Sequence, residues 1–205
     1  METVKTKLFE YGAKETEYLI KADPLLGDEI IRLGKIERII IPELFPALVY
    51  AIIGQQISSK ASKTIWERVQ ERFLEISPAN LTKIPIEDIR LCGIPQSKAG
   101  YIKEIARKIT EGEFDLNVLY KLSDKEVIKS LSSLGGIGMW TAETLLLNSM
   151  ERPNIISYGD ISIRRGLMKL YSLTELKKEQ FTVYKNRYSP YASVASLYIW
   201  KLAHE

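Results

Sequence analysis

Three of the four residues from Gly135 to Gly138 are glycine, and this segment separates two stretches with helical periodicity. Glycine adopts positive φ and lets another backbone approach closely, so the segment predicts a tight hairpin that Ile137 can anchor in the core. The next helix is expected to begin at Met139, with its unpaired first-turn amides facing whatever covers the hairpin. A DNA phosphate meets that requirement, but a plain turn between core helices explains the glycines equally well.

Apolar residues recur at spacings of three and four along almost the whole chain, and no run alternates as a strand does. The sequence therefore predicts an all-α protein, in which even residues 1–44 form short helices. The first clear helix is expected from Pro42 or Glu43 to Ile57, and the next is capped by Ser58 or Ser59. Another covers 97–110, and a further helix opens at Ser123 with Glu126 in capping-box spacing. The last helix is expected to begin near Ser189 and Pro190, with the proline in its first turn.

Composition limits the protein's class without indicating a function. With 205 residues, 45% of them hydrophobic, the chain can bury the core of one large domain or of two small lobes. A formal net charge of +3 permits a nucleic-acid partner but does not indicate one. The first residues lack a hydrophobic signal core, and no apolar run approaches the roughly 20 residues of a membrane helix. We therefore expect a cytoplasmic protein with no membrane partner.

Cys92 and His204 are the only cysteine and the only histidine. One cysteine cannot form an internal disulfide, a four-cysteine zinc site or an iron–sulfur cluster. His204 is next to last, so we expect it at the surface. That position argues against general-base chemistry by histidine and against a multi-histidine metal site.

Asp160 lies about twenty residues beyond the hairpin, where a new helix is expected to begin. Aspartate is a common N-cap, and taken alone the residue favours that structural role. A cap and a catalyst are compatible roles, however, because a helix N-terminus stabilises an ionised carboxylate. Both interpretations of Asp160 therefore remain open.

Two motifs together resemble the helix-hairpin-helix (HhH-GPD) superfamily of base-excision DNA glycosylases, and within it the branch similar to 3-methyladenine DNA glycosylase II. The pattern LxGIGxWTAE matches residues 134–143, and GDxxIRRGLxxLY matches residues 159–171. Further matching segments are 52–58, 189–191 and 198–200. The resemblance covers about residues 45–203, and the ordered combination of motifs is more specific than any one of them.

The resemblance implies two helical lobes with a catalytic cleft between them. One lobe would span 48–150 and contain the helix-hairpin-helix, and the other would combine 1–47 with 151–205. Such an enzyme flips a damaged nucleotide out of the duplex. Asp160 would stabilise the oxocarbenium-like charge that develops on the sugar, and it could also orient or deprotonate the attacking water.

Trp140 determines the expected reaction subtype. Relatives that also cut the DNA backbone carry a lysine at this place, whose amine forms a Schiff base. An indole cannot do so, which implies a monofunctional enzyme; Lys98 or Lys103 could substitute, but neither lies in the motif. Trp140 and Trp200 match aromatic walls of the base pocket, where a purine made cationic by alkylation would be attracted to an indole face. Without the motifs, both tryptophans would be assigned to the core.

Other implied contacts are with double-stranded DNA that contains damaged bases. Gln56 falls where relatives insert an apolar wedge, although Gln55 and Gln56 also fit plain solvent-facing positions. The expected DNA-binding residues are Gln55, Gln56, Gly135, Gly136, Ile137, Gly138, Thr141 and Arg164. The carbonyls of Ser132, Leu134 and Ile137 are the implied ligands of a Na⁺ or K⁺ ion, and no cofactor is expected to be required.

Function therefore has one leading interpretation and several alternatives. The leading one is a monomeric glycosylase that releases 3-methyladenine and 7-methylguanine. A glycosylase for oxidised or mismatched bases would share the same motifs. A non-catalytic helix-hairpin-helix module would need the hairpin but not Asp160, Trp140 and Trp200 together, and a helical protein-interaction scaffold would need none of them.

Overall fold

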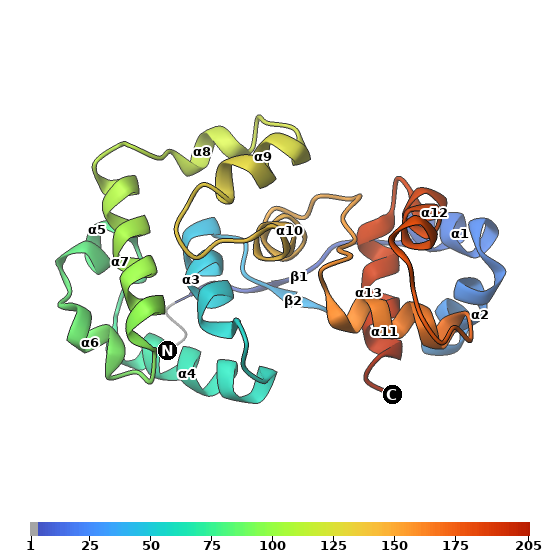
Figure 1. Cartoon of the computed structure of the whole chain (residues 1–205), viewed down its shortest axis with the longest axis horizontal. Helices are drawn as coiled ribbons and strands as arrows, with labels where there is room; N and C mark the ends of the chain where they lie inside the picture. Colours follow the sequence, from blue (N-terminus) through green and yellow to red (C-terminus); the bar gives the residue numbers. More distant parts are fainter. Residues whose placement is uncertain (1–3) are drawn as a thin grey trace. The chain divides into compact units, whose positions relative to one another are not determined.

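The computed structural model describes residues 4–205 (Figure 1). Within this range the chain forms thirteen helices and two short strands, which confirms the all-α prediction. No helix in the described range is both long enough and apolar enough to cross a membrane. The same residues contain no group of three or more His, Cys, Asp or Glu side chains arranged to hold a metal ion.

The chain divides into two compact units. We call residues 4–7 and 40–150 the hairpin unit, and residues 8–39 and 151–205 the Asp160 unit. The predicted boundary at residue 47 differs from this division, because residues 40–47 belong to the hairpin unit. The reason is that α3 (Leu44–Gly54) begins before residue 48 and buries Leu44, Phe45 and Leu48 among that unit's helices.

The hairpin unit is built around α3, which packs on α4, α7 and α10. Burial of nearly all of α3 follows from its sequence, which has no charged residue. The other helices of the unit are α4 (Ser59–Arg72), α5 (Pro78–Lys83), α6 (Ile86–Arg90), α7 (Gln96–Thr110), α8 (Leu116–Leu119), α9 (Asp124–Leu131) and α10 (Met139–Asn148).

Helix starts in the hairpin unit follow the predicted capping residues. The Ser58 hydroxyl accepts from the amide of Ala61 and caps α4. Ser123 and Glu126 form the predicted capping box of α9. The helix predicted over 43–57 is shorter, because α3 ends at Gly54 and Gln55 is its extended C-cap.

The Asp160 unit is built around α13 (Ala192–Leu202), which packs on α11 (Ile161–Leu170) and α2 (Pro24–Leu33). The remaining helices are α1 (Ala13–Ala22) and α12 (Lys178–Tyr188). α11 and α13 approach so closely that a Cβ at Gly166 would lie 2.0 Å from the carbonyl oxygen of Ile199. Pro190 lies outside α13 rather than in its first turn, because the N-cap Tyr191 has non-helical backbone angles (φ −112°, ψ 31°).

Two strands occur where only short helices were expected. β1 (Lys7–Leu8) pairs with β2 (Ile39–Ile40), and the amide of Phe9 extends the pairing by donating to the carbonyl of Arg38 at 2.8 Å. Two residues are too few to show an alternating pattern in the sequence, which explains why the strands were missed.

The buried carboxylate of Asp23 connects the start of α2 to residues near the end of the chain, Tyr171 and Arg187. Asp23 is 1% exposed and caps α2 by accepting from the amide of Leu26. Its second oxygen accepts from Arg187 at 2.7 Å and from the hydroxyl of Tyr171. The Tyr171 hydroxyl lies 2.6 Å from that of Tyr188, and burial raises the pKa of both tyrosines.

Candidate active site and DNA-binding hairpin

The hairpin joins α9 to α10 as a tight turn. The amide of Ile137 donates to the carbonyl of Leu134 at 3.1 Å, and the Ile137 side chain is 5% exposed, so it anchors the turn in the core as predicted. Gly136 has a positive φ of 81°. Gly138 is the N-cap of α10, whose first intrahelical bond runs from the amide of Ala142 to the carbonyl of Gly138.

Tyr101 of α7 packs beneath the hairpin and leaves no room for a side chain at Gly136. A Cβ at that position would lie 2.3 Å from Cδ2 of Tyr101, and one at Gly135 would lie 3.3 Å from Cδ1. Gly136 therefore needs to be glycine both for its backbone angle and for the ring below it.

Gln55 holds the hairpin against the end of α3. Its Nε2 donates to the carbonyl of Gly136 at 2.8 Å and to the hydroxyl of Thr141 at 3.1 Å, and Thr141 is only 3% exposed. These hydrogen bonds show that Gln55 and Thr141 have a structural role within the unit, and their contacts with DNA stay a prediction. Gln56 is exposed and has a positive φ of 57°, so it remains available at the end of α3.

Asp160 is the N-cap of α11, in the Asp160 unit. Its Oδ1 accepts from the amides of Ser162 at 2.7 Å and Ile163 at 3.2 Å. These two bonds fix the orientation of the carboxylate at the N-terminus of α11. Such a carboxylate is held in one orientation and suits the stabilisation of a nearby positive charge.

Trp140 and Trp200 belong to different units, Trp140 to α10 and Trp200 to α13. The Trp140 side chain is 38% exposed, which excludes the core interpretation for it. Trp200 is half-buried, and its ring contacts His204 and Arg38 of the same unit.

The sequence profile of the HhH-GPD superfamily base excision DNA repair protein matches residues 49–187, which include the hairpin and Asp160. The chain belongs to this superfamily. It is 30% identical to DNA-3-methyladenine glycosylase 1 of Schizosaccharomyces pombe, over 78% of this chain and 72% of that protein. It is 27% identical to the putative DNA-3-methyladenine glycosylase YfjP of Bacillus subtilis, over 77% of this chain but only 58% of the relative's length.

A solved structure of a relative has the same fold as this chain. The S. pombe 3-methyladenine DNA glycosylase in complex with abasic DNA superposes with a TM-score of 0.80 at 25% identity. The superposition covers 92% of this chain and 96% of that one. The S. pombe relative is thus named as a 3-methyladenine glycosylase and is seen bound to abasic DNA, and the B. subtilis relative is named as a putative one.

Lys98 and Lys103, the two possible substitutes for the missing hairpin lysine, both bind backbone carbonyls. Lys98 donates to the carbonyls of Ile53 at 2.9 Å and Gln55 at 2.6 Å, and burial lowers its pKa. Lys103 donates to three carbonyls at the end of α5, those of Leu81, Thr82 and Ile84. Their ammonium groups serve as caps for α3 and α5.

Arg164 is only partly available for DNA. Its guanidinium carbon lies 5.5 Å from the ring centre of Tyr158, and its Nε is buried without a hydrogen-bond partner among the described residues. His204, by contrast, was expected only as a surface residue. It is exposed, but its ring stacks on Trp200 four residues earlier, a spacing that places two side chains on one helix face.

Proposed function

We propose that the chain is a monofunctional DNA glycosylase that hydrolyses the N-glycosidic bond of alkylated purines, 3-methyladenine and 7-methylguanine, in double-stranded DNA. The observation that carries the proposal is Asp160 at the start of α11, fixed by two backbone amides within a matched HhH-GPD segment. The names of the relatives support the choice of alkylated purines. The proposal takes a monomeric, cytoplasmic enzyme as the active form.

Asp160 would act on the sugar of the damaged nucleotide. When the bond between the base and C1′ breaks, the bonding pair leaves with the base and positive charge develops on the sugar. The Asp160 carboxylate, oriented by the first amides of α11, would stabilise that charge. Water then adds at C1′ and gives up a proton, which the Asp160 carboxylate would accept.

Release of the base by hydrolysis, without cleavage of the DNA backbone, follows from the absence of an amine in the motif. Trp140 occupies the position of the lyase lysine, and the two alternative lysines bind backbone carbonyls. No Schiff base with the sugar is therefore expected, and the product is an abasic site.

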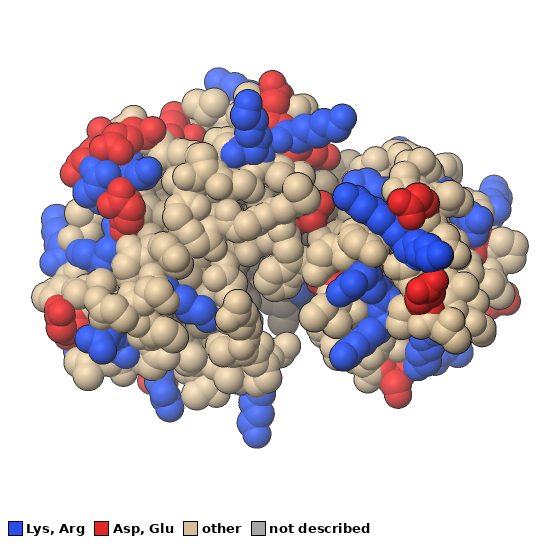
Figure 2. All heavy atoms as spheres, in the orientation of Figure 1, with Lys and Arg blue, Asp and Glu red and all other residues tan. Residues whose placement is uncertain are grey.

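The hairpin would bind a DNA phosphate through backbone amides at Gly136, Gly138 and the first turn of α10. Figure 2 shows that the middle of the hairpin unit's visible face carries few Lys and Arg side chains, which lie mostly at its edges, whereas several lie together on the visible face of the Asp160 unit. The proposal therefore assigns the phosphate grip to the hairpin backbone rather than to a lysine-rich surface. Affinity should fall as salt rises.

The implied monovalent cation has a suitable set of oxygen donors. Ser132 is the C-cap of α9, where the helix dipole leaves negative charge, and the Leu134 carbonyl already forms the turn with Ile137. Carbonyls of Ser132, Leu134 and Ile137 suit a hard ion such as Na⁺ or K⁺. A bound ion would add positive charge beside a phosphate and is proposed as an accessory to DNA binding.

The test compares the parent with Asp160→Asn on duplex DNA that carries labelled 7-methylguanine or 3-methyladenine. Asparagine caps helices as well as aspartate does, so this variant should fold and still bind DNA. We expect the parent to release free base and the variant to lose nearly all release. Equal release by both proteins would show that Asp160 is not catalytic, and efficient trapping of the parent on DNA by borohydride would contradict release of the base by hydrolysis.

A further inference from the structure

The indole of Trp200 already carries two partners from its own unit. The ring of His204 stacks on it with centres 3.9 Å apart and planes inclined by 30°, and Nδ1 of His204 lies 2.7 Å from the carbonyl oxygen of Trp200. The guanidinium carbon of Arg38 lies 5.2 Å from the centre of the same indole. That distance is within the range of a cation–π interaction.

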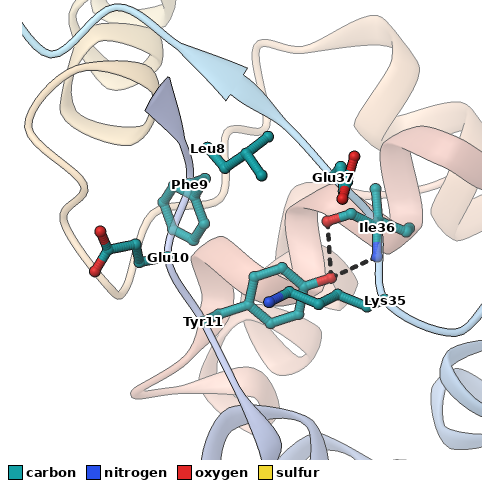
Figure 3. Close-up of a pocket in the computed structure, with 7 residues that line it drawn as sticks. All are labelled: Leu8, Phe9, Glu10, Tyr11, Lys35, Ile36 and Glu37. Carbon is teal, nitrogen blue, oxygen red and sulfur yellow. Dashed lines mark hydrogen bonds between the residues drawn. The ribbon is translucent and has the colours of Figure 1, made fainter. Parts of the chain in front are cut away.

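Hydrogen bonds hold the backbone that leads to Arg38. The carbonyl of Arg38 accepts from the amide of Phe9. Two residues earlier, the amide of Ile36 donates to the hydroxyl of Tyr11 at 2.7 Å, and this hydroxyl lies 3.0 Å from the carbonyl of Ile36 (Figure 3). The carbonyl of Gly34 accepts from the hydroxyl of Tyr198. The segment leading to Arg38 is thereby held at three points.

Figure 3 also shows that Lys35, three residues before Arg38, lies beside Tyr11. Lys35 and Glu37 line a pocket of about 540 Å³ together with residues 8–11. The Lys35 ammonium lies 5.7 Å from the ring centre of Tyr11, not against Trp200. Of these two basic residues, three positions apart, Arg38 faces the proposed wall of the base site and Lys35 faces the pocket.

Arg38 therefore gives the indole the interaction that a cationic base would otherwise make. An arginine stays charged at all physiological pH values, and two cations against one indole repel each other. We infer that Arg38 is a specificity-determining residue: it lowers the preference of the Trp200 wall for cationic bases relative to neutral modified bases. His204 holds the indole in place for this contact. The inference rests on the proposed glycosylase function.

The test measures single-turnover release of 7-methylguanine, cationic while attached to DNA, and of hypoxanthine, a neutral modified base, from otherwise identical duplexes. Arg38→Met keeps a long side chain and removes the charge. It should raise the ratio of 7-methylguanine to hypoxanthine release by about twofold to thirtyfold, the range that cation–π energies give. Arg38→Lys keeps the charge and should stay near the parent ratio.

Lys35→Met is the matched control, because it removes a nearby positive charge that does not face Trp200, and its ratio should equal that of the parent. Arg38→Gln, a second neutral variant, must shift the ratio in the same direction as Arg38→Met. An unchanged ratio in both neutral variants would overturn the role of Arg38 while leaving the glycosylase function intact. A parent protein that releases no base of either kind would instead refute the proposed function.

Discussion

The side-chain amide of Gln55 donates a hydrogen bond to the carbonyl oxygen of Gly136, 2.8 Å away. This contact joins the C-terminal end of α3 to the hairpin across 81 residues of sequence. Lys98 holds the same end of α3 by donating to the carbonyl of Gln55. Gln55, which the sequence predicts to bind DNA, thus stabilises the hairpin that is proposed to bind a DNA phosphate.

Replacing Gln55 by alanine should loosen the hairpin. The change removes hydrogen bonds to Gly136 and Thr141, so we expect a loss of about 1–2 kcal/mol in the free energy of unfolding. Affinity for an abasic duplex should fall, while the dependence of affinity on salt should keep its slope because the phosphate contacts remain. Urea unfolding and fluorescence anisotropy measure the two effects. Gln56→Ala is the control, since the exposed Gln56 side chain should leave the unfolding midpoint unchanged.

Replacing Gly136 by alanine should abolish tight DNA binding. The new Cβ would meet the ring of Tyr101 and would also force a β-carbon into a positive-φ conformation, so the turn must shift. Gly100→Ala, one residue from Tyr101 on α7, has open space and should raise the melting temperature instead. Undiminished DNA affinity in Gly136→Ala would contradict the role given to the hairpin.

Replacing Asp23 by alanine should cost the protein about 3 kcal/mol of stability. The variant loses the cap of α2 and leaves Arg187 and Tyr171 without the carboxylate they bind. Chemical denaturation measures the loss. Lys63→Ala breaks an exposed pair with Glu67 and should change the stability by less than about 0.5 kcal/mol. Similar values for the two variants would show that the buried cluster contributes little.

The stabilisation that the capping box of α9 contributes should depend on pH. The hydroxyl and the amide of Ser123 both donate to Glu126, and they hold the pKa of Glu126 below its ordinary value. Because the pKa is lower in the folded state, this stabilisation is complete above the ordinary pKa and is lost as the pH falls through the lowered one. An NMR titration of Glu126 should show the low midpoint, and Ser123→Ala should raise it. A midpoint that does not respond to Ser123→Ala would refute the assignment.

Local sequence patterns predicted the parts of the site that depend on neighbouring residues. The turn at Gly136, the helix start at Asp160 and the capping box at Ser123 each arise within a few positions, where residue preferences act directly. The family resemblance added the catalytic role that we propose for Asp160, which its position as a helix cap leaves open.

Contacts between distant residues were not predictable in the same way. Gln55 with Gly136, Asp23 with Arg187, and Arg38 with Trp200 join residues 81 to 164 positions apart, and no local pattern marks such pairs. His204 is different, because its spacing of four from Trp200 was visible in the sequence. It was missed because proximity to the end of the chain argued for an isolated surface residue.

The division of the chain has a consequence for the order in which the protein can fold during synthesis. Residues 40–150 of the hairpin unit are contiguous, so their helices can pack as soon as that stretch has left the ribosome. α1 and α2 emerge earlier but pack on α12 and α13, which are translated well over a hundred residues later. The Asp160 unit should therefore be the last to form on a nascent chain, and a stalled or truncated product should hold a folded hairpin unit without the unit that carries Asp160.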